Sequence, residues 1–271
     1  MALTIINRAK ASFLAYFCLQ QHGMKKVVID IGNTLTKVGV FEGKEIIVSK
    51  QFRGDEQIQL LSTGNEMQTS GIISSVRDIP GNIRQLISNI PHLITLSADT
   101  PLPFVLGYNS PETLGKDRIA AVAGARAVFP ECNILAIDAG TAITYDLLTA
   151  ENCYLGGGIS PGISTRFRAL HNYTGRLPLV HQQSFDELIG QTTEESIQSG
   201  VLNGVVAEVD GIIQRYSESF ENLHVVLTGG DLNYLADKLK SNIFALPNLV
   251  LMGLNEILDF NETPHKPDHI V

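Results

Sequence analysis

Short apolar runs recur along the chain, and two of them open the same pattern. Residues 28–37 and 136–144 each contain an apolar run ending in Asp, a Gly turn with hydroxyl side chains, and a second β-rich run. Short apolar runs bounded by turn residues are typical of buried strands. Each copy is therefore expected to form a strand, a turn and a strand, and the repetition predicts two similar domains.

The rest of the first half predicts a mixture of strands and helices. A Glu42-Gly43 turn joins two alternating runs, which is typical of a β-hairpin. The Ala-rich stretch 116–129 has helical spacing and ends at Pro130. The expected elements are strands at 37–40, 44–50, 71–76 and 92–96 and helices at 81–89 and 116–129, with a proline-marked loop from Pro101 to Pro111.

The second half repeats this organisation. Gly156–Gly162 is interpreted as a flexible loop that exposes its backbone, because four of its seven residues are glycine. A strand that runs into Thr228-Gly229-Gly230-Asp231 and then a helix is common in nucleotide-binding proteins. The expected elements are strands at 133–138 and 223–227, a hairpin through 145–155, and helices at 163–171, 196–220 and 233–240.

Length allows one large domain or two of about 120 residues, and the repetition favours two. We place the domains at 24–131 and 132–260, followed by a polar tail at 261–271. Residues 1–23 are interpreted as an upstream-start artefact or a disordered extension, rather than an added helix or a targeting sequence. The reason is that Met24 leads directly into the first expected strand and no small-residue cleavage site precedes it.

Composition favours small-molecule chemistry in the cytoplasm. The net charge of −8 and pI near 5.3 argue against a nucleic-acid partner or an anionic membrane surface, which require clustered Lys and Arg. The 3 cysteines have no C-x-x-C spacing, so neither a disulfide framework nor a zinc site is expected. No window approaches the ~20 apolar residues of a membrane helix.

The repeated turns have the chemistry of a phosphate cradle. Gly lets the backbone approach a phosphate, turn N–H groups and Thr hydroxyls donate to its oxygens, and a nearby Asp can hold a metal ion. Together with the Gly229-Gly230 turn, the two copies resemble the phosphate and adenosine motifs of the actin, Hsp70 and sugar-kinase ATPase superfamily. The resemblance implies an α/β fold of two actin-like (ribonuclease H-like) ATPase domains with a nucleotide cleft between them.

Further motifs between Met24 and Phe260 resemble those of type III pantothenate kinases. They are Asp30 to Lys37 (Asp-x-Gly-Asn-Thr-x-x-Lys), Tyr108, Gly115-Lys116-Asp117-Arg118 (Gly-x-Asp-Arg), Asp138 to Ala142, Gly157 to Gly162, Ala169-Leu170, Thr174 to Pro178 and Ile189 to Thr193. The family often has a small residue where this chain has Lys116, so the role of that lysine is open.

This resemblance implies ATP-dependent phosphorylation of pantothenate to 4'-phosphopantothenate, the first step of coenzyme A biosynthesis. A primary alcohol is a poor nucleophile, so a carboxylate that accepts its proton assists in-line transfer, and Asp117 is the expected base. Arg118 would hold an anionic or polar group of the substrate. The remaining expected substrate-binding residues are Tyr108, Gly115, Lys116 and Thr193, the last reaching the site from the partner in a homodimer.

On the nucleotide side, the resemblance implies ATP with Mg²⁺ and a monovalent cation, K⁺ or NH₄⁺. Asp138 is assigned to the monovalent cation, although its sequence context fits Mg²⁺ equally well. Lys37 supplies positive charge where negative charge accumulates. The expected ATP-binding residues are Asp30, Ile31, Gly32, Asn33, Thr34, Leu35, Thr36 and Lys37, with Thr141 opposite them in the second domain.

Several alternatives stay open at this point. Asp117 and Arg118 are also compatible with a surface ion pair at a helix start, where Asp is favoured. Three other functions are compatible with the motifs: a kinase of the same superfamily for another small alcohol or acid, an ATPase without an acceptor, and a non-catalytic regulator with this fold. Tyr108 and the 115–118 motif favour pantothenate over other acceptors, and the retained Lys37, Asp117 and Asp138 favour an enzyme.

Overall fold

The computed structural model describes residues 25–53 and 68–263, so residues 1–23 and most of the predicted tail lie outside the described residues. Five strands form the first sheet in the order β3-β2-β1-β4-β5. The central strand β1 is antiparallel to β2 and parallel to β4. The strands are β1 (Lys25–Ile31), β2 (Leu35–Glu42), β3 (Glu45–Arg53), β4 (Gln68–Ser75) and β5 (His92–Thr95).

The second sheet repeats the arrangement of the first. Its order is β11-β10-β7-β8-β9-β6, in which β7 is antiparallel to β8 and parallel to β10, as β1 is to β2 and β4. Its strands are β6 (Val105–Leu106), β7 (Ile134–Ala139), β8 (Ala142–Leu148), β9 (Cys153–Pro161), β10 (His224–Thr228) and β11 (Phe244–Ala245). The expected pair of similar α/β units is confirmed, while the boundary between 131 and 132 stays a prediction.

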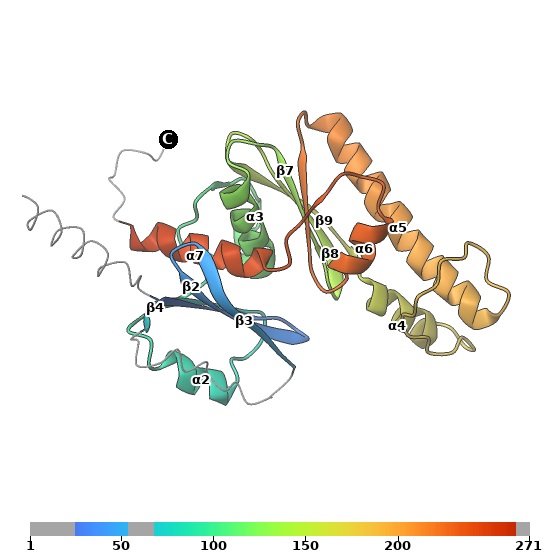
Figure 1. The fold of residues 1–271 in the computed structure, drawn as a ribbon, viewed down its shortest axis with the longest axis horizontal. Coiled ribbons are helices and arrows are strands. Elements are labelled where there is room, and N and C mark those ends of the chain that lie inside the picture. The colour runs from blue at the N-terminus through green and yellow to red at the C-terminus, as the bar shows by residue number, and fades with distance from the viewer. Residues whose placement is uncertain (1–24, 54–67, 264–271) are drawn as a thin grey trace, which may run out of the picture.

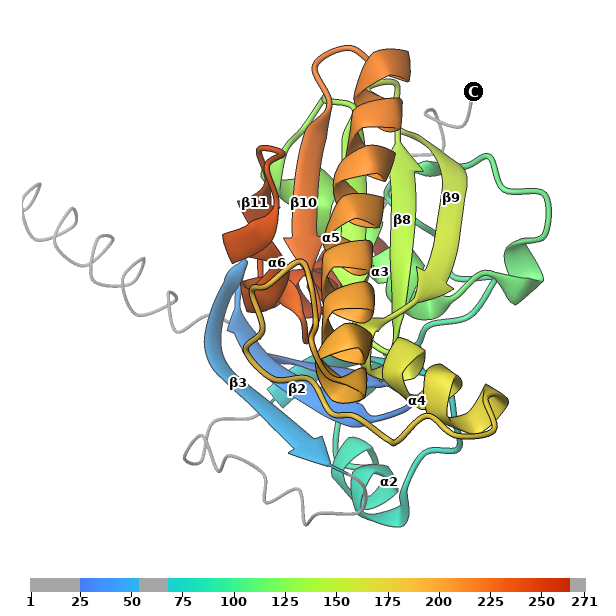
Figure 2. The ribbon, with the colours of Figure 1, turned by 90° about the vertical axis from the view of Figure 1, so that its right-hand side faces the viewer.

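Helices form three layers around the two sheets (Figures 1 and 2). Helix α2 (Gly81–Ile87) covers the outer face of the first sheet, whereas α3 (Lys116–Val128) and α7 (Leu249–Glu262) lie between the sheets. The outer face of the second sheet carries α4 (Ile163–Tyr173), α5 (Thr193–Ser219) and α6 (Leu232–Lys238); a 3-10 turn, η1 (Pro111–Thr113), precedes α3. None of the described helices is long and apolar enough to cross a membrane.

Strand alternation decides which side chains face the inner layer. Val28 of β1 and Ala136 of β7 are buried against α3 and α7, whereas Ile29 and Ile137 are buried on the opposite faces. Because side chains two apart share a face of a strand, the two residues that follow Val28 and Ala136 on these faces, Asp30 and Asp138, also point to the inner layer. The two similar strands thus aim their carboxylates toward α3.

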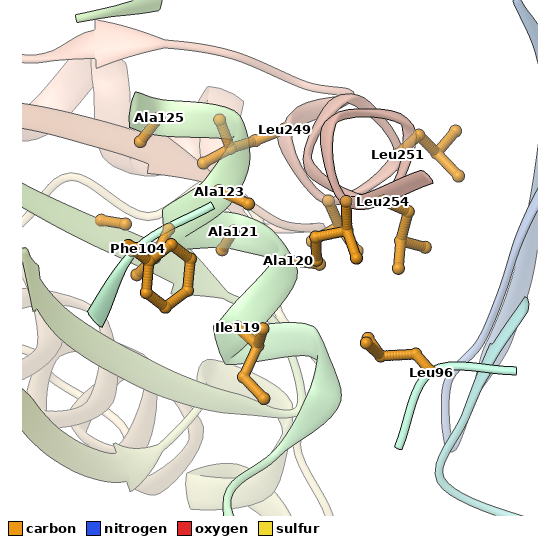
Figure 3. Packing of buried hydrophobic residues seen from close by; sticks show 14 of the residues in the cluster. Leu96, Phe104, Ile119, Ala120, Ala121, Ala123, Ala125, Leu249, Leu251 and Leu254 are labelled. Atoms are coloured by element: carbon orange, nitrogen blue, oxygen red, sulfur yellow. The ribbon is translucent and has the colours of Figure 1, made fainter. Parts of the chain in front are cut away.

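The two inner helices cross at glycines. A Cβ atom on Gly253 of α7 would overlap the carbonyl oxygen of Ala120 in α3, and one on Gly124 would overlap that of Leu249. Figure 3 shows the alanines of α3 beside the leucines of α7 in the same cluster. Close approach of the two backbones therefore depends on these glycines, and it fixes α3 between the sheets.

The short strands β6 and β11 were not predicted, and α5 begins at Thr193 rather than at residue 196. Two larger features also differ from the sequence predictions. The expected loop at 156–162 is mostly strand β9, paired with β8 through Pro161, because glycine lets it lie tightly against its neighbour: a Cβ on Gly157 would overlap the carbonyl oxygen of Tyr145. Helix α7 was not predicted. Leu249, Val250, Leu251 and Leu254 are all buried, so its first two turns are apolar on most sides and carry little helical periodicity.

The glycine crossing predicts a specific loss of stability. Gly253→Ala should lower the free energy of unfolding by about 2–4 kcal/mol, because the added methyl group forces α7 away from α3. Gly211→Ala in α5 is the matched control, since a Cβ there meets no atom within 4 Å and alanine favours a helix by about 1 kcal/mol. Urea unfolding of both variants measures the difference; equal stability of the two would contradict the packing role.

Candidate active site

Two exposed turns face each other between the sheets. Gly32-Asn33-Thr34 connects β1 to β2 and Gly140-Thr141 connects β7 to β8. Each turn is closed by a backbone hydrogen bond, from Gly32 N to Leu35 O at 3.0 Å and from Gly140 N to Ala142 O at 3.0 Å. The Oγ1 atoms of Thr34 and Thr141 are 3.3 Å apart. The first and second repeats therefore meet at their turns, with Asn33, Thr34 and Thr141 exposed to a ligand.

Sheet register brings Lys37 to Asp30. Asp30 is opposite Lys37 on β2 and opposite Ser74 on β4, so the three side chains share the inner face. Asp30 is only 8% exposed. Burial raises its pKa to about 6; Lys37 opposes this shift, whereas Asp117 and Asp138 add to it. The charges of Lys37, Asp117 and Asp138 therefore all influence the ionisation of Asp30.

Asp138 occupies the corresponding place in the second sheet. Burial raises its pKa to about 6, again opposed by Lys37 and reinforced by Asp117 and Asp146. Gly229 lies against it with φ of 101°, and a Cβ on Gly229 would be 2.5 Å from Asp138 Oδ1. Asp231 N also donates to Ala139 O at 2.9 Å. The predicted adenosine turn therefore lies beside the second phosphate turn, where only glycine fits.

The donor set fits phosphate-bound cations. Carboxylates that are buried, as Asp30 is, or half-buried, as Asp138 is, and that have raised pKa values bind a cation favourably, because its charge replaces the proton that they otherwise retain. Among the residues that the structure describes, no group of three or more His, Cys, Asp or Glu forms a preformed metal centre. Mg²⁺ commonly takes one or two carboxylates and completes its shell with water and substrate phosphates. Asp30 and Asp138 suit that mode of binding.

Helix α3 begins at the acceptor motif. Gly115 is its N-cap residue, and the Oδ1 atom of Asp117 accepts a hydrogen bond of 2.9 Å from the backbone N–H of Arg118. A Cβ on Gly115 would be 2.6 Å from that carboxylate oxygen, so glycine makes room for it. Lys116 Nζ donates to Ser75 O at 3.3 Å, which joins the start of α3 to the end of β4. Lys116 therefore has a described role in packing.

Arg118 is buried rather than exposed, so the surface ion-pair interpretation is wrong. Its side chain is 6% exposed, and its Nε and Nη2 atoms are each 2.8 Å from Asp146 Oδ1. Tyr154 OH donates to the same oxygen at 2.7 Å. The guanidinium Cζ lies 5.9 Å from the centre of the Tyr108 ring, which places Tyr108 and Arg118 together as expected.

The predicted site residues do not all meet within one chain. Thr193 is the first residue of α5, after a capping box in which Thr192 Oγ1 accepts from Glu195 N at 3.2 Å and Glu195 Oε2 accepts from Thr192 N at 3.1 Å. Figure 2 shows α5 on the outer face of the second sheet, whereas α3 lies on the inner face. Thr193 therefore belongs to a different layer from Asp117.

Three residues of the site were missed from the sequence. Asp146 accepts a hydrogen bond from Arg118, Tyr154 donates to Asp146, and Arg77 Nε donates to Gly32 O at 3.1 Å in the first phosphate turn. Asp146 carries a detectable signal, because an Asp inside an otherwise apolar alternating strand needs a buried partner. Arg77 and Tyr154 carry none, since their contacts come from strand order and register.

The duplicated sheets and facing Asp-x-Gly turns define a two-lobed α/β protein built to bind phosphate groups. The family model described as "Type III pantothenate kinase" matches residues 26–215. The type III pantothenate kinase of Christiangramia forsetii is 43% identical over 242 residues, covering 88% of this chain and 99% of the relative. That of Flavobacterium psychrophilum is 39% identical over 241 residues, covering 87% and 99%. The chain belongs to the type III pantothenate kinase family.

A solved structure supports the fold. A Campylobacter jejuni protein assigned to the Baf family of transcriptional activators is similar with a TM-score of 0.55 and 23% sequence identity, covering 87% of this chain and 98% of that one. At this level of identity the likeness concerns the arrangement of the chain alone. The actin-like α/β fold implied by the sequence motifs agrees with the two-sheet architecture and with membership of this kinase family.

The raised pKa of Asp30 predicts that removing its charge increases the stability of the fold, by an amount that depends on pH. In protein without nucleotide or cation, Asp30→Asn should stabilise the fold by about 1–3 kcal/mol above pH 6, where the native carboxyl is ionised at a cost. The gain should disappear below about pH 4, because the carboxyl is then protonated in both the folded and the unfolded state. Thermal unfolding at pH 4 and pH 7.5 measures it; destabilisation at pH 7.5 would contradict the electrostatic account.

Proposed function

We propose that the protein transfers the γ-phosphoryl group of ATP to pantothenate, giving 4'-phosphopantothenate at the start of coenzyme A biosynthesis. Family membership supports the acceptor, and one observation about the site carries the chemistry: Asp117, at the start of α3, acts electrostatically on both Asp30 and Asp138, the carboxylates of the two phosphate turns. This electrostatic coupling supports Asp117 as the base that acts between an acceptor hydroxyl and a bound γ-phosphate.

The acceptor side is assigned to the start of α3 and its surroundings. Asp117 accepts the proton of the pantothenate hydroxyl as the new P–O bond forms. The N-terminal end of α3 favours negative charge at the same place through its dipole and free N–H groups. Gly115 leaves space for the Asp117 carboxylate, Lys116 fixes the start of α3 against β4, and Tyr108 and Arg118 line the pocket.

The nucleotide side is assigned to the two turns. Backbone N–H groups around Gly32 and the hydroxyls of Thr34 and Thr141 bind the β- and γ-phosphates, and Lys37 neutralises the charge that develops there. Asp30 holds Mg²⁺ or its waters with the phosphates, which supplies charge stabilisation of the transferred group. Asp138 holds a monovalent cation, K⁺ or NH₄⁺. We assign the activity to the cytoplasm, where ATP and the coenzyme A pathway are found.

The alternatives have weaker support. An activity on another small alcohol or acid requires a different acceptor pocket, whereas Tyr108 and Asp117-Arg118 lie together at the inner layer. A purely regulatory protein gains nothing from several partly charged carboxylates around one lysine, since these repel one another without a bound cation. If the protein were an ATPase without an acceptor, the contact between the buried Arg118 and Tyr108 would have no role in its reaction.

A coupled assay of the purified chain tests the proposal. With ATP, Mg²⁺ and either K⁺ or NH₄⁺, pantothenate should be converted to 4'-phosphopantothenate, and omission of the monovalent cation should lower turnover. Asp117→Asn should lower kcat by about 10²–10⁴-fold with little change in pantothenate binding, because it removes the proton acceptor but keeps the shape. Phosphopantothenate is quantified by mass spectrometry.

Asp186→Asn is the matched control for this substitution. Asp186 is an exposed carboxylate that pairs with Lys238 at 2.6 Å on the outer side of the molecule, so its removal should leave turnover unchanged. Lack of phosphopantothenate from the wild-type protein under all cation conditions would contradict the proposed activity. A fully active Asp117→Asn variant would remove Asp117 from the role of base while leaving the activity itself in place.

We also propose that the active protein is a homodimer in which Thr193 completes the partner's pocket. Leu188 and Ile189 lie just before Thr193 and are 76% and 78% exposed, an unusual position for two large apolar side chains. Thr193 and Asp117 occupy different layers of one chain. In the proposed dimer, Thr193 therefore reaches the acceptor site of the second copy rather than that of its own chain.

Substitution of Ile189 tests the dimer. Ile189→Asp should shift sedimentation from dimer to monomer and raise the KM for pantothenate about tenfold or more, because a charge at a buried contact is costly and Thr193 is lost from the site. Ile189→Val should retain both properties. A wild-type protein that sediments as a monomer at micromolar concentration while fully active would overturn this assignment.

A further inference from the structure

One buried charge pair beside the site is not used by the proposed chemistry. Asp146 of β8 is fully buried, Arg118 of α3 is 5% exposed, and Tyr154 of β9 is fully buried. Asp146 lies opposite Ala136 in the sheet, so it faces the inner layer, as Asp138 does. The side chains of Arg118 and Tyr154 converge on a single oxygen, Asp146 Oδ1.

The pair decides which donors of Arg118 are available. A guanidinium group carries five N–H donors arranged in a plane. Nε donates to Asp146 Oδ1 at 2.8 Å, whereas Nη2 lies 2.8 Å from the same oxygen but is a buried donor without a hydrogen-bond partner among the described residues, so the Nη1–Nη2 end of the group keeps donors that Asp146 does not use. With Tyr108 beside the guanidinium and Tyr154 holding the carboxylate, the arginine has one defined orientation.

The pair also decides the charge that a substrate meets. Burial alone lowers the pKa of Arg118, but the charge of Asp146 and its hydrogen bond raise the pKa above its ordinary value, so the arginine stays protonated. Burial raises the pKa of Asp146, but the charge of Arg118 and the hydrogen bonds from Arg118 and Tyr154 favour its ionised form, and that carboxylate compensates the arginine within hydrogen-bond distance. At longer range, two opposite charges 2.8 Å apart act as a dipole rather than as a net charge. Arg118 in such a pair still donates hydrogen bonds but attracts a substrate carboxylate only weakly.

We propose that Asp146 and Tyr154 are positioning residues that present Arg118 as a hydrogen-bond donor of no net charge, which binds a neutral hydroxyl or carbonyl oxygen of the acceptor rather than its carboxylate. The inference rests on the proposed function for the identity of the acceptor. It narrows the sequence-based expectation, which allowed either an anionic or a polar group for Arg118. The stability of the fold does not require such a pair, because apolar residues of similar volume commonly replace buried ion pairs without loss.

Two acceptors distinguish the neutral from the anionic alternative. One is pantothenate, and the other is its alcohol analogue, in which CH₂OH replaces the carboxylate and the reacting hydroxyl is unchanged. The measured quantity is the ratio of their kcat/KM values, or of their Kd values by calorimetry where turnover is slow. Arg118→Gln should weaken both acceptors by about tenfold or more with the ratio unchanged, because it removes donors to an oxygen that both contain.

Asp146→Asn and Tyr154→Phe separate charge from orientation. Asp146→Asn keeps the shape but leaves the charge of Arg118 uncompensated, so the ratio should shift about tenfold toward pantothenate. Tyr154→Phe removes one hydrogen bond and no charge, so KM should rise about threefold or more for both acceptors while kcat and the ratio stay constant. Val205→Ala, a buried change on the opposite face of the second sheet, controls for lost stability and should move neither KM nor the ratio.

The outcomes are distinct. An Arg118→Gln variant that loses pantothenate alone would overturn the proposal, because Arg118 would then bind the carboxylate. Unchanged KM values and ratio in both Asp146→Asn and Tyr154→Phe would assign these residues a purely structural role and overturn it as well. If Asp146→Asn does not fold, Tyr154→Phe and Arg118→Gln still decide. If the wild-type protein phosphorylates neither acceptor, the proposed function and the inference are both contradicted. If the wild-type protein is active but the variants leave the KM values and ratios unaltered, the inference alone is contradicted.

Discussion

The close crossing of α3 and α7 at Gly124 and Gly253 is the constraint on which the arrangement of the site depends. It brings two helix backbones into direct contact between the sheets, at a distance that any side chain would prevent. Helix α7 also contacts β1, β2 and β4 of the first sheet, and α3 contacts β7 and β8 of the second. The crossing therefore sets the position of the start of α3, and with it Asp117 and Arg118, relative to both phosphate turns.

The electrostatics of the site follow from strand register. Alternation along β1 and β7 directs Asp30 and Asp138 inward, and antiparallel pairing places Lys37 beside Asp30. The same rule directs Asp146 inward from β8, where it forms an ion pair with Arg118. In the proposed assignment, the inner layer contains a charged region for nucleotide and cation next to a neutral, donor-rich region for the acceptor.

Much of this could be predicted from the sequence, because it depends on local signals. The repeated Asp-x-Gly turns and the start of α3 at Gly115 are each specified by residues within a few positions of one another. Helix α5 begins at Thr193 rather than at the predicted residue 196, although its cap is also a local signal. The capping box of Thr192 and Glu195 is an example in which side chains and backbone agree.

The features that were missed depend on distant parts of the chain. Arg118 is separated from Asp146 by 28 residues, and Arg77 from Gly32 by 45, so their contacts follow from topology alone. The part of β9 from Gly156 to Pro161 was expected to be a loop because its glycines are flexible in isolation, whereas close pairing with β8 requires them. Helix α7 was missed because burial on most of its surface removes the amphipathic pattern that reveals a helix.

A crystal structure of the protein with a non-hydrolysable ATP analogue, Mg²⁺ and pantothenate tests the central claim most directly. The account predicts the β- and γ-phosphates between the turns at Gly32-Thr34 and Gly140-Thr141, with the pantothenate hydroxyl on the Asp117 carboxylate and in line with the γ-phosphate. Phosphates bound elsewhere, or pantothenate bound with its hydroxyl away from Asp117, would contradict the assignment of the inner layer as the site of phosphoryl transfer.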